Sequence, residues 1–133
     1  MAKDCVDHAA TLAQLDERPC VTRELAIHGA SGEGEAELKG LIDVNPSLGI
    51  PLHDKLPITP AHVVLAARGE MARTIDDVLA RRTRALVLNA RAATEMAPTV
   101  ADILAGELGR NPKWVDEQLA SFNQLARTYL LQN

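Results

Sequence analysis

Cysteine and histidine are the residue types best suited to metal binding and catalysis, and their spacing here argues against both roles. Cys5 and Cys20 are separated by 14 residues and are the only cysteines, so a four-thiolate zinc site cannot be completed. The four histidines form no i, i+3 or i, i+4 pair, so no helix presents two imidazoles to one metal ion. No G-x-S-x-G motif surrounds a serine. We therefore expect no catalytic, cofactor-binding or metal-binding residue in this chain.

Three glycines within residues 29–34 raise the question of a phosphate-binding turn before a helix. Their order is G-x-x-G-x-G, whereas the dinucleotide-binding turn requires G-x-G-x-x-G. Glu33, Glu35 and Glu37 would also place negative charges where a pyrophosphate should bind. The stretch is predicted to be a linker.

The arginine cluster ARRTRA at residues 80–85 is the most distinctive local feature. On a helical projection of 100° per residue, Arg82 falls on the same face as the apolar Ile75 and Leu86, which predicts that it points inward. An inward guanidinium needs a partner, because an unpaired buried charge is very unfavourable. Glu70 flanks the apolar face of the preceding helix, so we predict a structural ion pair between Glu70 and Arg82.

The other arginines of this region leave alternatives open. A helix, a short turn and a second helix capped by Thr74 give the outline of a helix-turn-helix, whose second helix would aim its arginines at DNA. We expect Arg81, Arg84 and Arg91 to face solvent or a partner, either a protein or membrane headgroups. The chain has 14 basic and 18 acidic residues, and its net charge of −4 disfavours a general nucleic-acid binder.

Composition and periodicity predict an all-α fold, a compact bundle of about five to six helices with an irregular N-terminal joint. Alanine and leucine dominate the 133 residues, and only three residues are aromatic, which favours helices over strands. Proline at positions 19, 46 and 98 and glycine at position 109 are expected to end helices. The predicted helices cover residues 6–15, 35–44, 60–71, 75–96, 98–108 and 112–129.

The sequence carries no apolar stretch of the roughly 20 residues that a membrane-spanning helix needs. Acidic residues occupy the N-terminus, where a signal peptide would have an apolar run, which predicts a cytoplasmic protein.

Residues 70–86 resemble a string found in the C-terminal helical domain of FAD-dependent glycerol-3-phosphate dehydrogenases and the related alpha-glycerophosphate oxidases. That string reads E-M-A-R-T-x-x-D-x-L-A-R-R-T-R-A-L, and residues 100–109 are similar to a second one, V-A-x-I-L-A-x-E-L-G. Residues 25–32, LAIHGASG, are similar to the joint through which the family enters this domain. The resemblance implies that residues 1–18 are the last helix of the FAD-binding domain, residues 19–34 a linker and residues 35–133 the C-terminal helical domain.

The resemblance also implies a function. The parent enzyme would oxidise sn-glycerol 3-phosphate to dihydroxyacetone phosphate, with a hydride passing to FAD and electrons then passing to quinone, or to oxygen in the oxidases. The family's flavin-binding turn, phosphate-binding arginines and catalytic base lie in a preceding portion and match no position here.

The segment alone is accordingly expected to bind no FAD and to be inactive. Its role would be packing on the catalytic FAD domain of the same chain, with a homodimer left open. The parent would be peripheral at the cytoplasmic face of the inner membrane. The competing interpretation is an acidic helix-turn-helix DNA-binding regulator.

Overall fold

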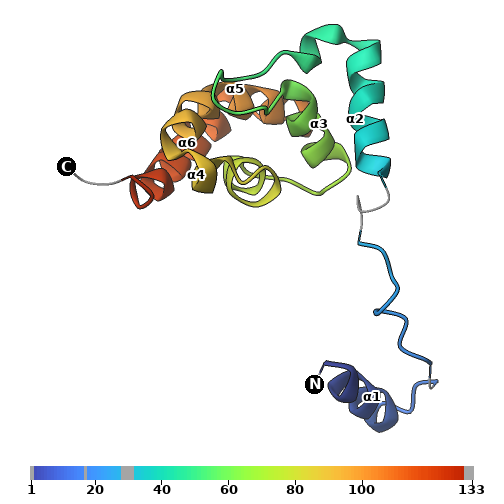
Figure 1. Cartoon of the computed structure of the whole chain (residues 1–133). Helices are drawn as coiled ribbons and strands as arrows, with labels where there is room; N and C mark the ends of the chain where they lie inside the picture. Colours follow the sequence, from blue (N-terminus) through green and yellow to red (C-terminus); the bar gives the residue numbers. More distant parts are fainter. Residues whose placement is uncertain (1, 17, 28–31, 131–133) are drawn as a thin grey trace. The chain divides into compact units, whose positions relative to one another are not determined.

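The computed structural model describes residues 2–16, 18–27 and 32–130 of the chain (Figure 1). The contacts divide it into two compact units, Met1–Gly34 and Glu35–Asn133, which are described separately. Within the described residues all regular elements are helices, and the one extended pairing is an isolated bridge between His53 and Leu56. The prediction of an all-α fold is confirmed.

The first unit contains helix α1 (Ala2–Leu12), and none of the residues of α1 is buried. The helix predicted for residues 6–15 therefore begins and ends earlier than expected. Gln14 adopts a left-handed conformation with φ of 54°, which ends the helix before proline can act. The two cysteines of the chain lie in this unit, and both are exposed free thiols.

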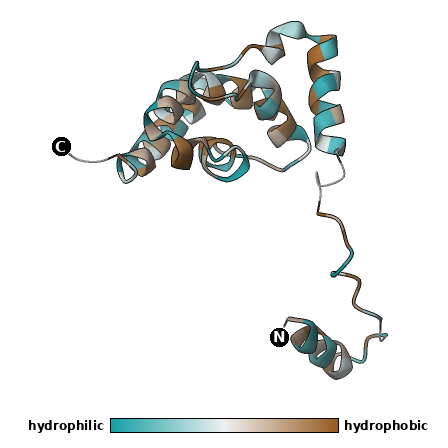
Figure 2. Cartoon of the chain, in the orientation of Figure 1, coloured by the Kyte–Doolittle hydropathy of each residue, from teal (hydrophilic) through white to brown (hydrophobic). Residues whose placement is uncertain are grey.

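A helical bundle occupies the second unit, in which α5 (Ala90–Leu108) is the central helix and contacts α3 (Pro60–Arg68), the π-helix η2 (Asp77–Arg82), α4 (Ala85–Leu88) and α6 (Pro112–Arg127) (Figure 1). Figure 2 shows apolar and hydrophilic residues alternating along these helices, as expected for amphipathic helices around one core. In chain order, α2 (Glu33–Val44) and the 3-10 helix η1 (Pro46–Gly49) precede these helices.

Small side chains on α5 allow the neighbouring helices to approach closely, and larger side chains fill the remaining core. The buried alanines of α5 are Ala92, Ala93, Ala97, Ala101 and Ala105. The largest fully buried side chains include Ile75, Leu79, Leu86, Leu104 and Phe122. Trp114, the only tryptophan, is partly buried against this core.

Local capping explains where several helices begin. Asn111 caps α6 by accepting a hydrogen bond from the Trp114 amide at 2.9 Å, and Pro112 follows at the first helical position. At the start of α3, the Nδ1 atom of His62 accepts a hydrogen bond from the Thr59 amide at 3.1 Å. The predicted starts of α3 and α6 are confirmed.

The prediction of one helix over residues 75–96, broken at Pro98, is wrong. The break falls at Asn89, whose extended backbone ends α4 and whose side chain caps α5 by accepting from the Ala92 amide at 3.1 Å. Pro98 lies inside α5 on its exposed face. A proline inside a helix costs about 3 kcal/mol, and the burial of eight α5 side chains offsets that cost.

Candidate functional site

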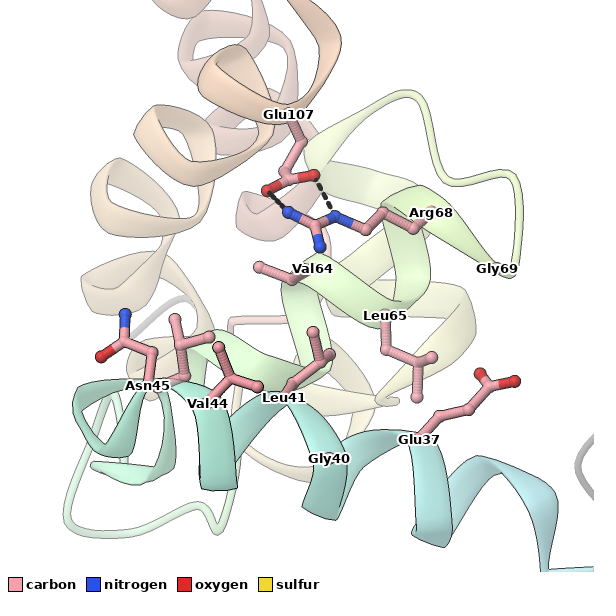
Figure 3. A pocket seen from close by; sticks show the side chains of 11 residues that line it. Glu37, Gly40, Leu41, Val44, Asn45, Val64, Leu65, Arg68, Gly69 and Glu107 are labelled. Atoms are coloured by element: carbon pink, nitrogen blue, oxygen red, sulfur yellow. Dashed lines mark hydrogen bonds and ion pairs between the residues drawn. The ribbon is translucent and has the colours of Figure 1, made fainter.

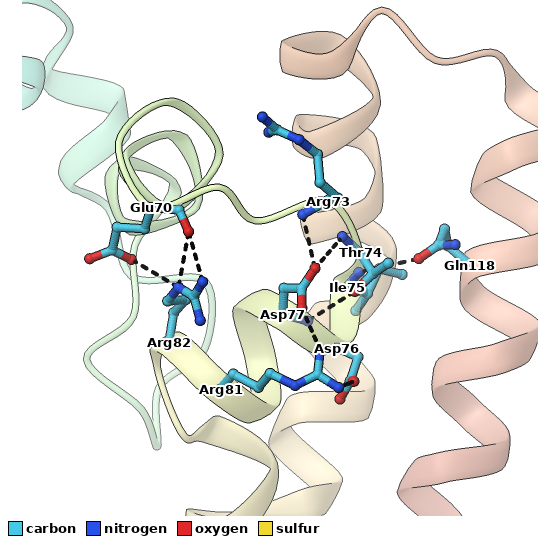
Figure 4. A network of polar contacts seen from close by, with 9 residues as sticks. All are labelled: Glu70, Arg73, Thr74, Ile75, Asp76, Asp77, Arg81, Arg82 and Gln118. Carbon is cyan, nitrogen blue, oxygen red and sulfur yellow. Dashed lines mark hydrogen bonds and ion pairs between the residues drawn. The ribbon is translucent and has the colours of Figure 1, made fainter. Parts of the chain in front are cut away.

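A network of polar contacts connects α3 to η2, along the stretch that carries the sequence motif (Figure 4). We call this cluster the motif network. Its members are Glu70, Arg73, Thr74, Asp76, Asp77, Arg81 and Arg82.

The chain reverses direction after α3 through Met71, which has a left-handed backbone with φ of 58°. The Ala72 amide donates to the Ala66 carbonyl at 2.9 Å, which closes the turn. The Nη1 atom of Arg73 donates to the carbonyls of Ala67 and Ala72, at 3.1 and 3.0 Å. Arg73 thus satisfies the Ala67 carbonyl at the end of α3 and the Ala72 carbonyl in the turn that follows.

Thr74 and Asp77 cap the next helix reciprocally. The Asp77 amide donates to the Thr74 hydroxyl at 3.1 Å, and the Asp77 carboxylate accepts from the amides of Thr74 and Arg73, both at 3.0 Å. Burial disfavours the charged carboxylate, but the hydrogen bonds with Arg73, Thr74 and Arg81 outweigh it and lower the pKa of Asp77. Asp77 is therefore held ionised at the positive end of this helix.

The side chain of Arg81 is engaged inside the network. Its Nη2 atom lies 2.6 Å from the Asp76 carboxylate, and its Nη1 atom pairs with Asp77. Two carboxylates thus neutralise its charge, although the side chain is partly exposed. A DNA-reading role for this arginine receives no support, since η2 has only six residues and the chain breaks again at Arg84, whose φ is 57°.

The structure brings Glu70 and Arg82 together. The Arg82 Nη2 atom donates to the Glu70 carbonyl at 2.7 Å, and Arg82 Nε lies 3.7 Å from the Glu70 carboxylate. The inward orientation expected for Arg82 is wrong, because its side chain is 36% exposed. A π-helix closes i→i+5 hydrogen bonds, so a projection at 100° per residue fails across η2.

Arg84 and Arg91 differ from Arg81 because, among the described residues, their guanidinium groups form no hydrogen bond or ion pair. Between them, Val87 and Leu88 of α4 are 67% and 69% exposed. The Val87 and Leu88 amides both donate to the Arg84 carbonyl at 3.1 Å, which places the three residues on one turn. We call this surface the α4 patch, and its members are Arg84, Val87 and Leu88.

A groove with a volume of about 740 Å³ lies beside α2 and α3 (Figure 3). Arg68 and Glu107 form a two-point ion pair at one rim, with distances of 2.6 and 2.8 Å. Glu37 also lines the groove, and its carboxylate has no hydrogen-bond or ion-pair partner among the described residues. We call this the α2–α3 groove, and its apolar lining residues are Leu41, Val44, Leu48, Val64 and Leu65.

Sequence reasoning missed the groove, because its walls come from helices whose packing no local motif specifies. The available signal was Gly40, which leaves one side of α2 without a side chain.

Among the described residues, the imidazole of His53 contacts a carboxylate on a different part of the fold. Its Nε2 atom lies 2.8 Å from the Glu95 carboxylate of α5, and its Nδ1 atom lies 2.8 Å from Asp54. These contacts fasten the loop before α3 to α5. Within residues 2–16, 18–27 and 32–130 no group of three histidine, cysteine or acidic side chains is placed to hold a metal ion.

Comparison with known proteins gives two matches. The sequence model of the family described as the C-terminal domain of alpha-glycerophosphate oxidase matches residues 32–118. Over 85 residues, or 64% of its length, the chain is 38% identical to the probable glycerol-3-phosphate dehydrogenase, mitochondrial, of Caenorhabditis elegans. That alignment covers 11% of the relative, so the chain spans about a tenth of the length of this curated relative. No solved structure matches.

Proposed function

The chain belongs to the family of the C-terminal domain of alpha-glycerophosphate oxidase, and from this premise we propose that it serves as the non-catalytic C-terminal helical domain of an FAD-dependent glycerol-3-phosphate dehydrogenase. The observation that carries the proposal is the family match over residues 32–118, which contains the whole motif network. The parent would oxidise sn-glycerol 3-phosphate to dihydroxyacetone phosphate, with FAD accepting the hydride and quinone the electrons. It would lie at the cytoplasmic face of the inner membrane, and no described helix is long and apolar enough to cross a membrane.

The role proposed for this segment is structural packing on the catalytic FAD domain of the same chain. The motif network supports this role, because Arg73, Arg81 and Arg82 contact neighbouring backbone or carboxylate groups of the same unit. The ion pair between Glu70 and Arg82 is proposed to tie the turn after α3 to η2.

The domain division follows from the same proposal. Residues 1–18 would be the last helix of the FAD-binding domain, residues 19–34 a linker and residues 35–133 the helical domain. The change of contact unit after Gly34 and the start of the family match at residue 32 both support this division.

The residues of this chain do not fit FAD. A pyrophosphate held by a glycine-rich turn would lie at the start of α2. The exposed Glu33, Glu35 and Glu37 place three negative charges there, which would repel it. Part of the glycine-rich stretch, residues 28–31, lies outside the described residues. We derive no step of flavin chemistry from this segment.

A binding experiment tests the proposed lack of catalysis. The purified chain is incubated with excess FAD and passed through a gel-filtration column, and flavin absorbance is followed across the protein peak. No co-eluting flavin and no oxidation of sn-glycerol 3-phosphate are expected, and a yellow protein peak would overturn this part of the proposal.

The parent itself is tested by reading the genomic frame upstream of the codon for Met1. An open frame that continues into a flavin-binding motif is expected. A regulatory sequence there, together with a salt-sensitive shift of duplex DNA by the chain, would instead indicate the helix-turn-helix regulator.

A further inference from the structure

His53 lies in the short loop before α3, and backbone contacts close that loop on itself. The Leu52 amide donates to the Ile58 carbonyl at 2.8 Å, and His53 forms an isolated bridge with Leu56. Leu56 and Ile58 are buried in the core, and the His53 side chain is only 14% exposed. We call residues 52–58 the His53 loop. Its closed backbone holds one imidazole in a fixed place against α5.

The hydrogen bonds of the imidazole assign the position of its proton. The Lys55 amide donates to Nδ1 of His53 at 3.1 Å, so Nδ1 acts as an acceptor. A neutral imidazole has a single N–H group, which must then lie on Nε2. The Nε2 atom is 2.8 Å from the Glu95 carboxylate and donates to it. The neutral ring therefore links the loop to α5 through one hydrogen bond.

A carboxylate lies beside Nδ1 that the neutral ring cannot use. The Oδ1 atom of Asp54 is 2.8 Å from Nδ1 of His53, and a lone pair on that nitrogen repels a second acceptor. A protonated Nδ1 is a donor instead, so it attracts the Asp54 carboxylate and no longer accepts from the Lys55 amide. The two contacts of Nδ1 exclude each other, and protonation of the ring decides between them.

The two carboxylates reach the ring from different parts of the fold, Asp54 from the His53 loop and Glu95 from α5. Both carboxylates are largely exposed to solvent, which weakens their attraction for a cationic ring. Other titratable or charged side chains on the same loop, on α3 and along the same side of α5 are Lys55, His62, Arg91 and Asp102.

We propose that the His53 loop is a pH-sensitive contact with α5 that tightens in acid. Protonation by solvent transfers Nδ1 from the Lys55 amide to the Asp54 carboxylate and turns the contact between Nε2 and Glu95 into an ion pair. Histidine changes its charge between about pH 5 and 8. The added attraction is therefore present at the acidic end of this range and is lost as the pH rises. This inference goes beyond the proposed function and does not depend on it.

Nitrogen NMR of the histidine rings in the full chain tests the position of the proton. The resonances of His53 are assigned by their loss in His53→Asn. At about pH 8 the proton is expected on Nε2 alone, and at about pH 5.5 on both ring nitrogens, with the Lys55 amide resonance moving over the same pH range. A proton on Nδ1 at the higher pH, or a Lys55 amide that does not respond, would overturn the proposal.

Urea denaturation of Glu95→Gln tests the tightening in acid. This substitution should raise the equilibrium constant of unfolding about two- to fivefold at the lower pH and less at the higher pH, because only the cationic ring forms an ion pair. The contribution of His62 cancels, since wild type and variant both contain it. Asp102→Asn, at an exposed carboxylate on the same side of α5, is the matched control and should show no such difference.

The same substitution in a His53→Asn background separates the proposed contact from a general effect of charge on α5. Without the imidazole, Glu95→Gln should have the same small effect at both pH values. An effect of Glu95→Gln in the wild-type background that does not grow on acidification would overturn the proposal, as would a pH-dependent effect that persists in His53→Asn.

Discussion

Asp77 shows how one carboxylate can organise a turn. It accepts hydrogen bonds from two backbone amides and pairs with Arg81, so its removal leaves several donors without a partner. We expect Asp77→Asn to lower the free energy of unfolding by about 1–3 kcal/mol. Urea denaturation at neutral pH measures this change.

Asp116→Asn is the matched control for this variant, because Asp116 is exposed on α6 and its carboxylate forms no hydrogen bond or ion pair with any described residue. It should change the free energy of unfolding by less than about 0.5 kcal/mol. Equal effects of the two substitutions would show that the network does not stabilise the fold.

His62 should make stability depend on pH. Burial lowers its pKa below the ordinary value of 6.5, while Glu70 opposes this weakly. The unfolded chain then binds the proton more readily, so stability is full above pH 6.5 and falls as the pH drops below that value. His62→Asn should lose less stability than wild type between pH 7.5 and 5, measured by urea denaturation at both pH values. An identical loss in both proteins would contradict this assignment.

At the residue scale, the sequence could predict which groups meet but not how they meet. The pairing of Glu70 with Arg82 follows from charge and spacing, whereas the exposed position of Arg82 depends on the π-helix. The strongest contact of Arg82 is to the carbonyl of Glu70, since a hydrogen bond to a charged donor contributes about 1.5–3 kcal/mol and an exposed ion pair about 0–1 kcal/mol.

At the element scale, Pro98 inside α5 provides a test of what holds this helix together. Pro98→Ala adds one amide donor to the helix and removes a steric clash, so we expect a gain in stability of about 1–3 kcal/mol. The shift of the urea midpoint measures it. Pro112→Ala, at the first helical position of α6, is the control and should give no gain. A loss of stability in Pro98→Ala would show that the proline is favourable where it stands.

Helix starts were predictable because their signals are local, whereas the breaks between η2, α4 and α5 were not. Thr59 and Asn111 stand directly before proline and cap as expected. Asn89 is the same type of capping residue, but no proline follows it, and Pro98 lies inside α5 without ending it. Packing of α5 against its neighbours decided between them, and no window of sequence contains that information.

At the scale of the whole molecule, the two units should differ in stability. None of the described residues in 2–27 is buried, while the core lies entirely among residues 56–126. A chain starting at residue 33 should therefore unfold at the same urea concentration as the full chain, followed by circular dichroism. A lower midpoint would show that the first unit contributes to the core.

The fold class could be predicted from composition and periodicity, whereas the family followed from the resemblance of residues 25–32, 70–86 and 100–109 to known strings. The α2–α3 groove was not accessible, because it arises where Leu41 and Val44 of α2 come beside Val64 and Leu65 of α3. Such an arrangement depends on long-range packing, which the spacing of residues within one helix does not encode.

The distribution of thiols and indole offers a way to observe the two units in solution. Both cysteines lie in the first unit, and Trp114, the only tryptophan, lies in the second. The hydrogen bond from Thr22 lowers the pKa of Cys20, so a thiol-reactive dye should label it before Cys5. Energy transfer from the tryptophan to that dye would then report how far apart the units stay, with no added mutation.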